Sequence, residues 1–283
     1  MQRLKNFASL LSSDLYKLMR MKSVYIGIGV MIFLTLIIAL AQNALTDLLN
    51  SLPEDGSPLD PSEVDAVTGT FLFTMLNGAP SSTGVFFLMP IIAALFIGSD
   101  FSSGMTRLFV GRGVSKTELY ISKYITLSLL SVIYVCLSFA MCAVAAKASE
   151  VSEEALSSLF SYTASAFGAQ IFLAFTLAAI YTAVCFSMRS KAASMATLIA
   201  MLIILGDVLV MVVQISLAML TTGTDVTGKF VYMLFDPYYC ADAFASASVF
   251  TPQEAGIAYG GCAMWLVLFF FGGLLLNAER DVK

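Results

Sequence analysis

The chain has 283 residues, a formal net charge of −4 and no histidine. Hydrophobic residues make up 59% of it and charged residues only 12%, whereas soluble globular domains are about a quarter charged. This composition excludes an ordinary soluble domain and predicts a polytopic membrane protein. The length accommodates several spans of about 20 residues each but no sizeable soluble domain, so we expect a single transmembrane domain over residues 1–283.

Residues 1–22 precede the first apolar run and have a helical pattern of their own. Leu4, Phe7, Leu11 and Leu18 recur on one face together with Leu15, and most polar residues lie off that face. The pattern predicts an amphipathic interfacial helix along the inner membrane surface. A cytosolic extension of the first span is the alternative.

Six apolar runs are long enough to cross a bilayer as helices. They lie at 24–42, 82–101, 124–146, 167–188, 194–220 and 256–276. The first run follows a long basic region, so it is interpreted as an uncleaved span and not as a signal peptide. The expected fold is therefore an all-α polytopic membrane protein with six transmembrane helices.

The cations predict which ends of these spans face the cytoplasm, because Lys and Arg are retained on that side. With the N-terminus inside, thirteen of the fifteen cations fall on inner segments, and only Lys147 and Lys229 fall outside. The first outer loop, at about 43–81, instead carries six acids. Both termini are therefore expected in the cytoplasm. The acidic net charge reflects the outer loops, and no nucleic acid partner is expected.

Catalytic and cofactor chemistry has little support in the sequence. The absence of histidine excludes His-based acid–base catalysis and His-ligated zinc sites. The five cysteines form no C-x-x-C pair, and no nucleophile-elbow or metalloprotease motif occurs. The stretch GRGVSKT resembles the end of a Walker A loop, but Ser115 stands where a glycine must precede Lys116. We therefore expect no enzyme and no ATP site in this chain.

A polar segment at 102–118 separates the second and third predicted spans. Asp100 or Ser102 is expected to cap a short helix there, and the GRG sequence to end it. Ser115 and Glu118 have capping-box spacing, which predicts the start of the next helix.

The short helix of this segment combines apolar and basic residues. Leu108 and Phe109 lie between Arg107 and Arg112. Such a pattern suits a helix that docks in a groove of another protein.

The stretch SDFSSGMTRLFVGRGVSKTELYISK resembles the cytoplasmic segment of ABC-2 type permeases, particularly the bacterial group of lantibiotic, bacitracin and sodium exporters. The positions that match the pattern of this family are Asp100, Phe101, Gly104, Arg107, Ser115, Lys116 and Lys123. The stretch departs from the pattern at Asp100, where Glu is commoner, at Met105, where Gly is usual, and at Lys116, where Arg is usual.

The resemblance implies that the segment is a coupling helix seated in a cleft of a separate ABC ATPase subunit. The residues that would couple the two proteins are Asp100, Phe101, Gly104, Arg107, Leu108, Phe109, Arg112 and Lys116. Two permease chains, identical or different, and two ATPase chains would form an exporter in the bacterial cytoplasmic membrane. ATP and Mg²⁺ would be bound by the ATPase, so this chain would hold no cofactor.

Asp207 lies near the middle of the predicted fifth span, with Gln214 on the same helical face seven residues later. A carboxylate at that depth costs at least ~2.5 kcal/mol on insertion scales, so it either lines a translocation path or fixes helix packing. The acidic outer loop and Asp207 slightly favour an amphipathic or antimicrobial peptide as the substrate. The alternatives are a secondary transporter or channel, or a membrane scaffold or sensor without transport.

Overall fold

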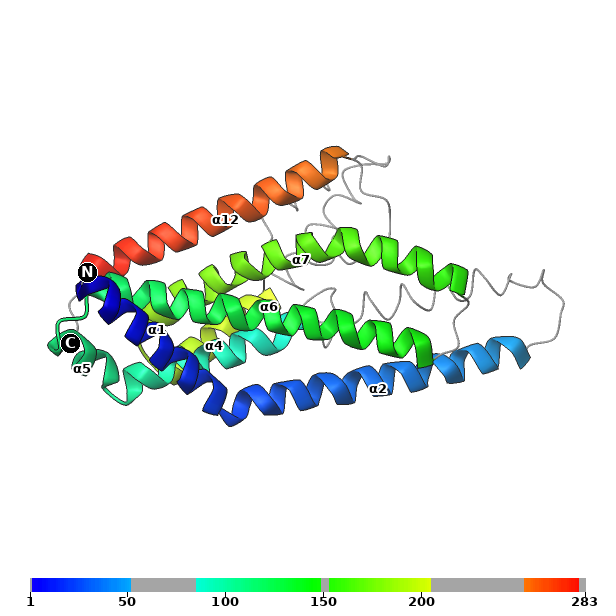
Figure 1. Ribbon diagram of the computed structural model, residues 1–283, viewed down its shortest axis with the longest axis horizontal. Coiled ribbons are helices and arrows are strands. Elements are labelled where there is room, and N and C mark those ends of the chain that lie inside the picture. The colour runs from blue at the N-terminus through cyan, green and yellow to red at the C-terminus, as the bar shows by residue number, and fades with distance from the viewer. Residues whose placement is uncertain (1, 52–84, 149–152, 205–251, 280–283) are drawn as a thin grey trace.

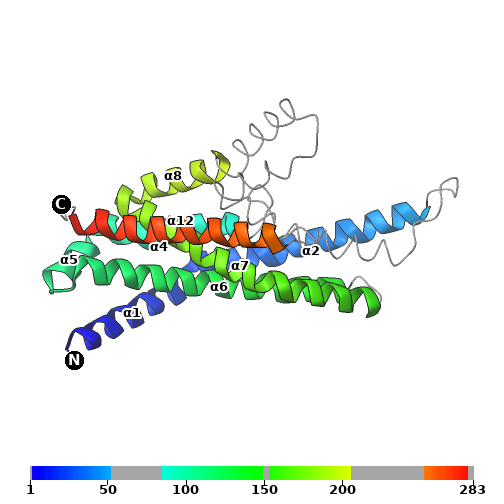
Figure 2. The ribbon, with the colours of Figure 1, turned by 90° about the horizontal axis from the view of Figure 1, so that it is seen from above.

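The computed structural model describes residues 2–51, 85–148, 153–204 and 252–279. All regular elements in these ranges are helices, and no strand occurs among them, as the composition predicted. The helices are α1 (Gln2–Arg20), α2 (Lys22–Ser51), α4 (Val85–Ser102), α5 (Met105–Gly111), α6 (Lys116–Ala148), α7 (Glu153–Met188), α8 (Lys191–Ile203) and α12 (Pro252–Glu279). The start of α1, the short helix α5 and the end of α12 lie at the same end of the bundle (Figures 1 and 2).

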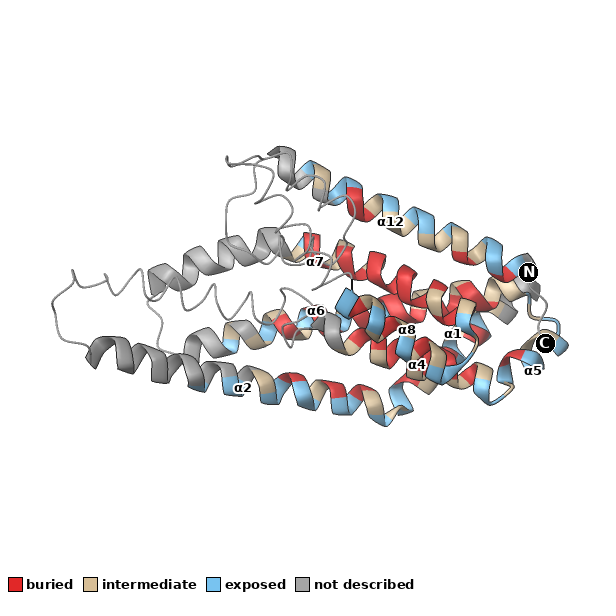
Figure 3. Cartoon of the chain, turned by 180° about the vertical axis from the view of Figure 1, so that it is seen from behind, coloured by how far each residue is buried: buried red, intermediate tan, exposed pale blue. Residues whose placement is uncertain are grey.

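Helix α7 is the centre of the bundle. It packs against α4, α6, α8 and α12. Most residues of its apolar stretch Phe167–Met188 are buried, whereas few residues of Tyr259–Ala278 in α12 are. The buried part of α7 contains alanines at 169, 174, 178, 179 and 183, and such small side chains let neighbouring helices approach closely. In Figure 3 the buried residues follow α7 and the facing sides of α4 and α6, whereas α2 and α12 present exposed residues outward.

A described helix overlaps each of the six predicted spans, although the second span is described only from 85 and the fifth only through 204. Within the described residues, three helical stretches are long and apolar enough to cross a membrane: Lys116–Met141, Phe167–Met188 and Tyr259–Ala278. The bent pair α4 and α5 would make a fourth. The number of six crossings and the cytoplasmic position of both termini therefore stay predictions.

The N-terminal helix is separate from the first apolar helix, because the chain leaves the helical path at Met21 between α1 and α2. Figure 1 shows α1 at an angle to α2. The side of α1 that faces the bundle carries the buried residues Leu10, Asp14 and Leu18. The predicted apolar face is therefore only partly right, since Leu11 and Leu15 are half-buried and a carboxylate occupies the middle of the buried stripe. The position of α1 on a membrane surface stays a prediction.

Candidate functional site

The site begins where the chain turns sharply at the end of α4. Helices α4 and α5 meet at 62° across a two-residue break. Gly104 makes the turn with a φ of 72°, a left-handed conformation that costs glycine no steric penalty. The cap predicted for this helix was wrong, because Gly104 is the N-cap residue and no side chain caps it. The chain instead keeps Ser102 inside α4 and uses the carboxylate of Asp100 in ion pairs.

The other end of α5 is closed by a Schellman motif. The Val114 amide donates to the Phe109 carbonyl at 3.1 Å, and the Gly113 amide donates to the Val110 carbonyl at 3.0 Å. Gly113 has the left-handed φ of 87° that this motif requires. The prediction that the GRG sequence ends the helix is thus confirmed. Three residues, 112–114, lie between the end of α5 and Ser115, where the cap of α6 begins.

The predicted capping box at the start of α6 is confirmed. The Glu118 amide donates to Ser115 Oγ at 3.1 Å, and the Ser115 amide donates to Glu118 Oε2 at 3.1 Å. These reciprocal bonds satisfy two donors that a helix start leaves without partners. The segment between α4 and α6 therefore has a defined conformation at three places: the turn at Gly104, the Schellman motif and the capping box.

Helix α5 exposes an apolar and basic surface at the end of the bundle. Leu108 is 57% exposed and Met105 is 42% exposed. Arg107 and Arg112 are also exposed beside them. Phe109 differs, because it is half-buried and packs against the core of this chain. The outward surface of α5 is thus formed by Met105 and Leu108 and not by Phe109.

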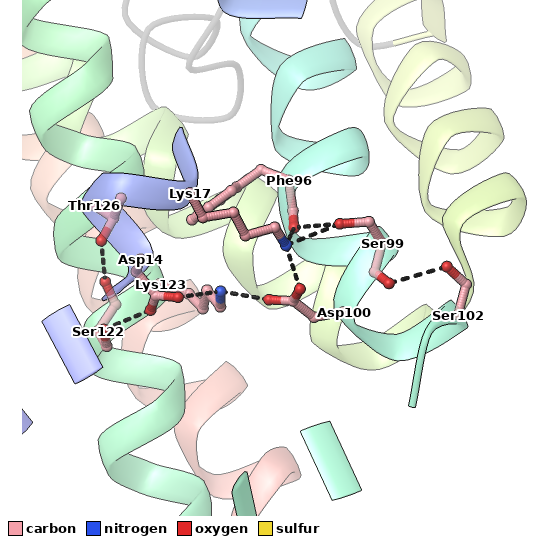
Figure 4. A network of polar contacts seen from close by, with 9 residues as sticks. All are labelled: Asp14, Lys17, Phe96, Ser99, Asp100, Ser102, Ser122, Lys123 and Thr126. Atoms are coloured by element: carbon pink, nitrogen blue, oxygen red, sulfur yellow. Dashed lines mark hydrogen bonds and ion pairs between the residues drawn. The ribbon is translucent and has the colours of Figure 1, made fainter. Parts of the chain in front are cut away.

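A buried charge network lies directly behind this turn (Figure 4). We call Asp14 and Lys17 of α1, Asp100 of α4 and Lys123 of α6 the charge quartet. Lys123 Nζ lies 2.5 Å from Asp14 Oδ1 and 2.5 Å from Asp100 Oδ2. The first contact is a hydrogen bond, whereas the second is an ion pair without hydrogen-bond alignment. Lys17 pairs with the other oxygen of Asp100, which links all four residues.

Neighbouring groups form hydrogen bonds and a cation–π contact with the quartet. Ser122 Oγ donates to Asp14 Oδ2 at 2.7 Å. Lys17 Nζ donates to the Phe96 carbonyl at 3.1 Å and to Ser99 Oγ at 3.0 Å. The ammonium of Lys123 lies 4.4 Å from the centre of the Phe96 ring, within the range of a cation–π contact.

The quartet balances two carboxylates against two ammonium groups, so its formal charge is zero. The Lys123 side chain is 2% exposed and that of Asp14 is 3% exposed. Taking such charges out of water is costly, and only close pairing with further hydrogen bonds offsets the cost. Lys17 lies at the rim: partial burial lowers its pKa from the ordinary value, against the hydrogen bond and the charge of Asp100, which raise it.

The position of the quartet links the turn to three helices. Asp100 lies four residues before Gly104, one helical turn from the bend. Through Lys123 and Lys17 it is joined to α6 and α1. The quartet therefore joins the helix that precedes α5 to both α1 and α6.

The remaining predicted site residues have different surroundings. The ring of Phe101 packs edge-on against Phe186 of α7 at 5.2 Å. The carbonyl of Lys116 accepts a hydrogen bond from Asn277 Nδ2 of α12 at 3.0 Å. Asp207 and Gln214 lie outside the described residues. No group of three or more His, Cys, Asp or Glu side chains that could hold a metal occurs in the described ranges.

Sequence reasoning identified Asp100 and Lys123 as motif positions but did not pair them, and it singled out neither Asp14 nor Lys17. One signal was present: Leu10, Asp14 and Leu18 are spaced by four residues, so the acid falls within an apolar stripe. A carboxylate buried in such a stripe needs a countercharge or hydrogen-bond donors, or else it becomes protonated, so its position marks a candidate for pairing.

The comparison with known families decides the class of the protein. The family model described as ABC-2 family transporter protein matches residues 10–207. The chain belongs to the ABC-2 transporter family. The matched range contains the whole charge quartet and α5. No curated protein matches the chain at a significant level. This ABC-2 protein is thus a multi-pass membrane component of a transport system.

Proposed function

We propose that this ABC-2 protein is the permease subunit of an ATP-driven exporter in the bacterial cytoplasmic membrane, and that α5 docks in a cleft of a separate ABC ATPase. One observation carries the proposal: α5 exposes apolar and basic side chains, and the end of α4 that precedes it is held by the buried charge quartet. Met105 and Leu108 have the exposed apolar area that docking would bury. Arg107 and Arg112 flank it and suit acidic residues at the rim of a cleft.

The defined turns on both sides of α5 suit this helix to transmit movement. A flexible loop would absorb a push from the ATPase, whereas α5 is held by Gly104, by the Schellman motif and by the Ser115–Glu118 capping box. Closure of the ATPase on ATP would shift α5, and the charge quartet would carry that shift into α1, α4 and α6. ATP and Mg²⁺ belong to the ATPase in this scheme.

The transport path requires further components. A second permease chain, the same or different, would complete the membrane part, and two ATPase subunits would drive it. Asp207 and Gln214 are proposed to face the path. The six acids of the first outer loop and Asp207 favour a cationic amphipathic peptide as the substrate.

The test is a substitution at the exposed tip of α5. Leu108→Asp places a charge where an apolar side chain would be buried, a burial worth roughly 1.5 to 3 kcal/mol. We expect binding of the ATPase to weaken by about tenfold to a hundredfold. Arg112→Ala removes a rim charge, typically worth about 1 kcal/mol or less, so its effect should be much smaller. The measurements are copurification of the ATPase and substrate-stimulated ATP hydrolysis in reconstituted membranes.

Two controls keep this test specific. Met19→Asp adds the same charge at a position of α1 that is 63% exposed, and it should leave ATPase binding unchanged. Phe109→Asp is expected to disturb the permease itself, because Phe109 packs against its own core. If Leu108→Asp and the wild type copurify the ATPase equally, α5 is not the docking helix. If no ATPase copurifies with the wild type, the secondary transporter and scaffold functions take precedence.

A further inference from the structure

The junction between α1 and α2 carries exposed residues that the proposed function does not use. The chain leaves the helical path at Met21, whose amide donates to the Leu18 carbonyl at 3.1 Å. Arg20 lies just before this residue and Lys22 just after it, and both are exposed. Figure 1 shows the junction as the bend between the two helices. Two cations therefore stand where the first apolar helix begins.

Two tyrosines fix the conformation of the junction. The Tyr25 hydroxyl donates to the Met19 carbonyl at 2.7 Å, which ties the first turn of α2 to the last turn of α1. The Arg20 guanidinium lies over the ring of Tyr16, 5.3 Å from its centre. Both rings are nevertheless largely exposed. Tyrosine is enriched where a membrane meets water, because its ring is apolar and its hydroxyl is polar.

The cations of the junction have no acidic partner among the described residues. Asp14 is the only acidic residue before Asp47 in the sequence, and its side chain is buried in the charge quartet. The ion pairs of the described residues include neither Arg20 nor Lys22. The ring of Tyr16 attracts Arg20 but does not neutralise it. The junction therefore presents two uncompensated positive charges, which suit an anionic partner.

An exposed apolar stripe begins at the same place and follows α2. Its members recur every three or four residues, which places them on one face of a helix. They are Ile26, Val30, Phe33, Ile37 and Leu40. The eleven residues from Ile26 to Ile37 rise by about 16 Å, close to half of the ~30 Å hydrocarbon core of a bilayer. This part of the stripe has the depth of one leaflet.

The order of these groups matches the layers of a single leaflet. Cations come first, where phosphate groups lie, then tyrosine rings, and then apolar side chains at the depth of acyl chains. An acidic soluble protein would pair with the cations but would leave the apolar stripe uncovered. A second copy of this chain, paired through the same face, would cover the stripe but would bring two more cations to the junction. A lipid with an anionic head group matches both parts.

We propose that the junction between α1 and α2 binds an anionic phospholipid of the inner leaflet. Arg20 and Lys22 contact its phosphate group, Tyr16 and Tyr25 lie at the level of its glycerol backbone, and an acyl chain lies along 26–37. Helix α1 supplies half of the charge quartet, so the bound lipid anchors the end of the helix that holds Asp100. The proposal rests on α2 lying in the membrane, as predicted for 24–42, and does not depend on an ATPase.

The experiment reports lipid contact at the stripe through one tryptophan. Trp265→Phe removes the only native tryptophan, and Phe33→Trp adds one at a position that is 62% exposed. The full chain with both changes, purified without any ATPase, is reconstituted in phosphatidylcholine vesicles with increasing fractions of phosphatidylglycerol brominated in its acyl chains. Bromine quenches tryptophan fluorescence only at close range. Brominated phosphatidylcholine provides the reference titration, so the ratio of the two binding constants gives the preference for the anionic lipid.

We expect a preference of roughly fivefold or more for phosphatidylglycerol. Arg20→Gln and Lys22→Gln should each lower it by roughly threefold to fivefold, because each cation near an anionic head group contributes about that factor. Added salt should lower it as well. Lys191→Gln is the matched control, since Lys191 is an exposed lysine at the start of α8 and should leave the preference unchanged.

Folding controls keep the comparison valid. Circular dichroism and size-exclusion chromatography establish that each variant is folded. Leu36→Trp, at another exposed position of α2, is the second reporter if Phe33→Trp does not fold.

Several results would overturn the proposal. Equal quenching by the two brominated lipids would refute the site while leaving α2 in contact with lipid. A preference that survives both Arg20→Gln and Lys22→Gln, or that falls equally in Lys191→Gln, would show that these cations do not form the site. Absence of quenching by either lipid at both reporters would show that protein covers the stripe, as a second copy of this chain would. No ATPase enters the experiment, so the proposed function is tested separately by Leu108→Asp.

Discussion

Replacing Lys123 by methionine tests the charge quartet most directly. Lys123 is the cation between Asp14 and Asp100, at 2.5 Å from each. Without it, Asp100 keeps its pair with Lys17, but Asp14 keeps only the hydroxyl of Ser122. The substitution therefore leaves one buried carboxylate without a countercharge. Breaking a buried pair in this way costs about 3–5 kcal/mol, a large part of the ~5–15 kcal/mol by which most proteins are stable.

A compensating substitution distinguishes charge imbalance from a general packing defect. Asp14→Asn combined with Lys123→Met restores a formal charge of zero, because Asp100 and Lys17 still balance each other. The double variant should recover most of the free energy of unfolding that Lys123→Met loses. Lys22→Met, at an exposed lysine, should change it by less than about 0.5 kcal/mol.

The free energies can be measured by denaturant titration of the detergent-solubilised protein. The single tryptophan, Trp265 of α12, reports unfolding by its fluorescence. If the double variant is no more stable than Lys123→Met, the quartet does not act through charge balance. A loss below about 1 kcal/mol for Lys123→Met would show that water or another group replaces the ammonium.

Three other predictions test the surrounding framework. Gly98→Ala would place a Cβ 2.8 Å from a backbone Cα of α8, so it should lower the free energy of unfolding in the same titration. Gly29→Ala is the control, because no atom lies within 4 Å of its added Cβ and stability should not change. Ser115→Ala removes half of the capping box and should cost about 1 kcal/mol in that titration. In the six-span topology, a cysteine at Ser57 should react with an impermeant thiol reagent on intact cells and one at Ser190 should not; labelling at 190 from outside would contradict the orientation.

The sequence predicted the features of this fold that depend on near neighbours. The Ser115–Glu118 capping box and the glycine that ends α5 both rest on contacts within a few residues. The all-helical class followed from composition and apolar runs. Such features are readable because the interacting groups and the pattern lie in the same short stretch.

The charge quartet could not be predicted in the same way. Asp100 was assigned to a helix cap because it stands just before a short helix, which is a local signal. In the structure Asp100 forms ion pairs with Lys17 and Lys123 and does not cap the helix. These partners lie 83 and 23 residues away in the sequence, and Asp14 and Lys123 are separated by 109 residues. No periodicity in one chain encodes which distant charges will meet.

The charges in the segment between α4 and α6 and those in the two flanking helices have different roles. Arg107 and Arg112 are exposed at the end of the bundle, whereas Asp100 and Lys123 are buried and form an ion pair with each other. The charges of Asp100 and Lys123 already cancel without α1. Helix α1 adds one more acid, Asp14, and one more base, Lys17, so charge neutrality alone does not explain why α1 carries these two residues. Its carboxylate and ammonium instead bind the two far ends of the pair and cover it from water, where a bare pair would be weak. We therefore expect the N-terminal helix to stiffen the base of α5. Under the proposed function, an export defect from its loss should appear as poor coupling even where the ATPase still binds.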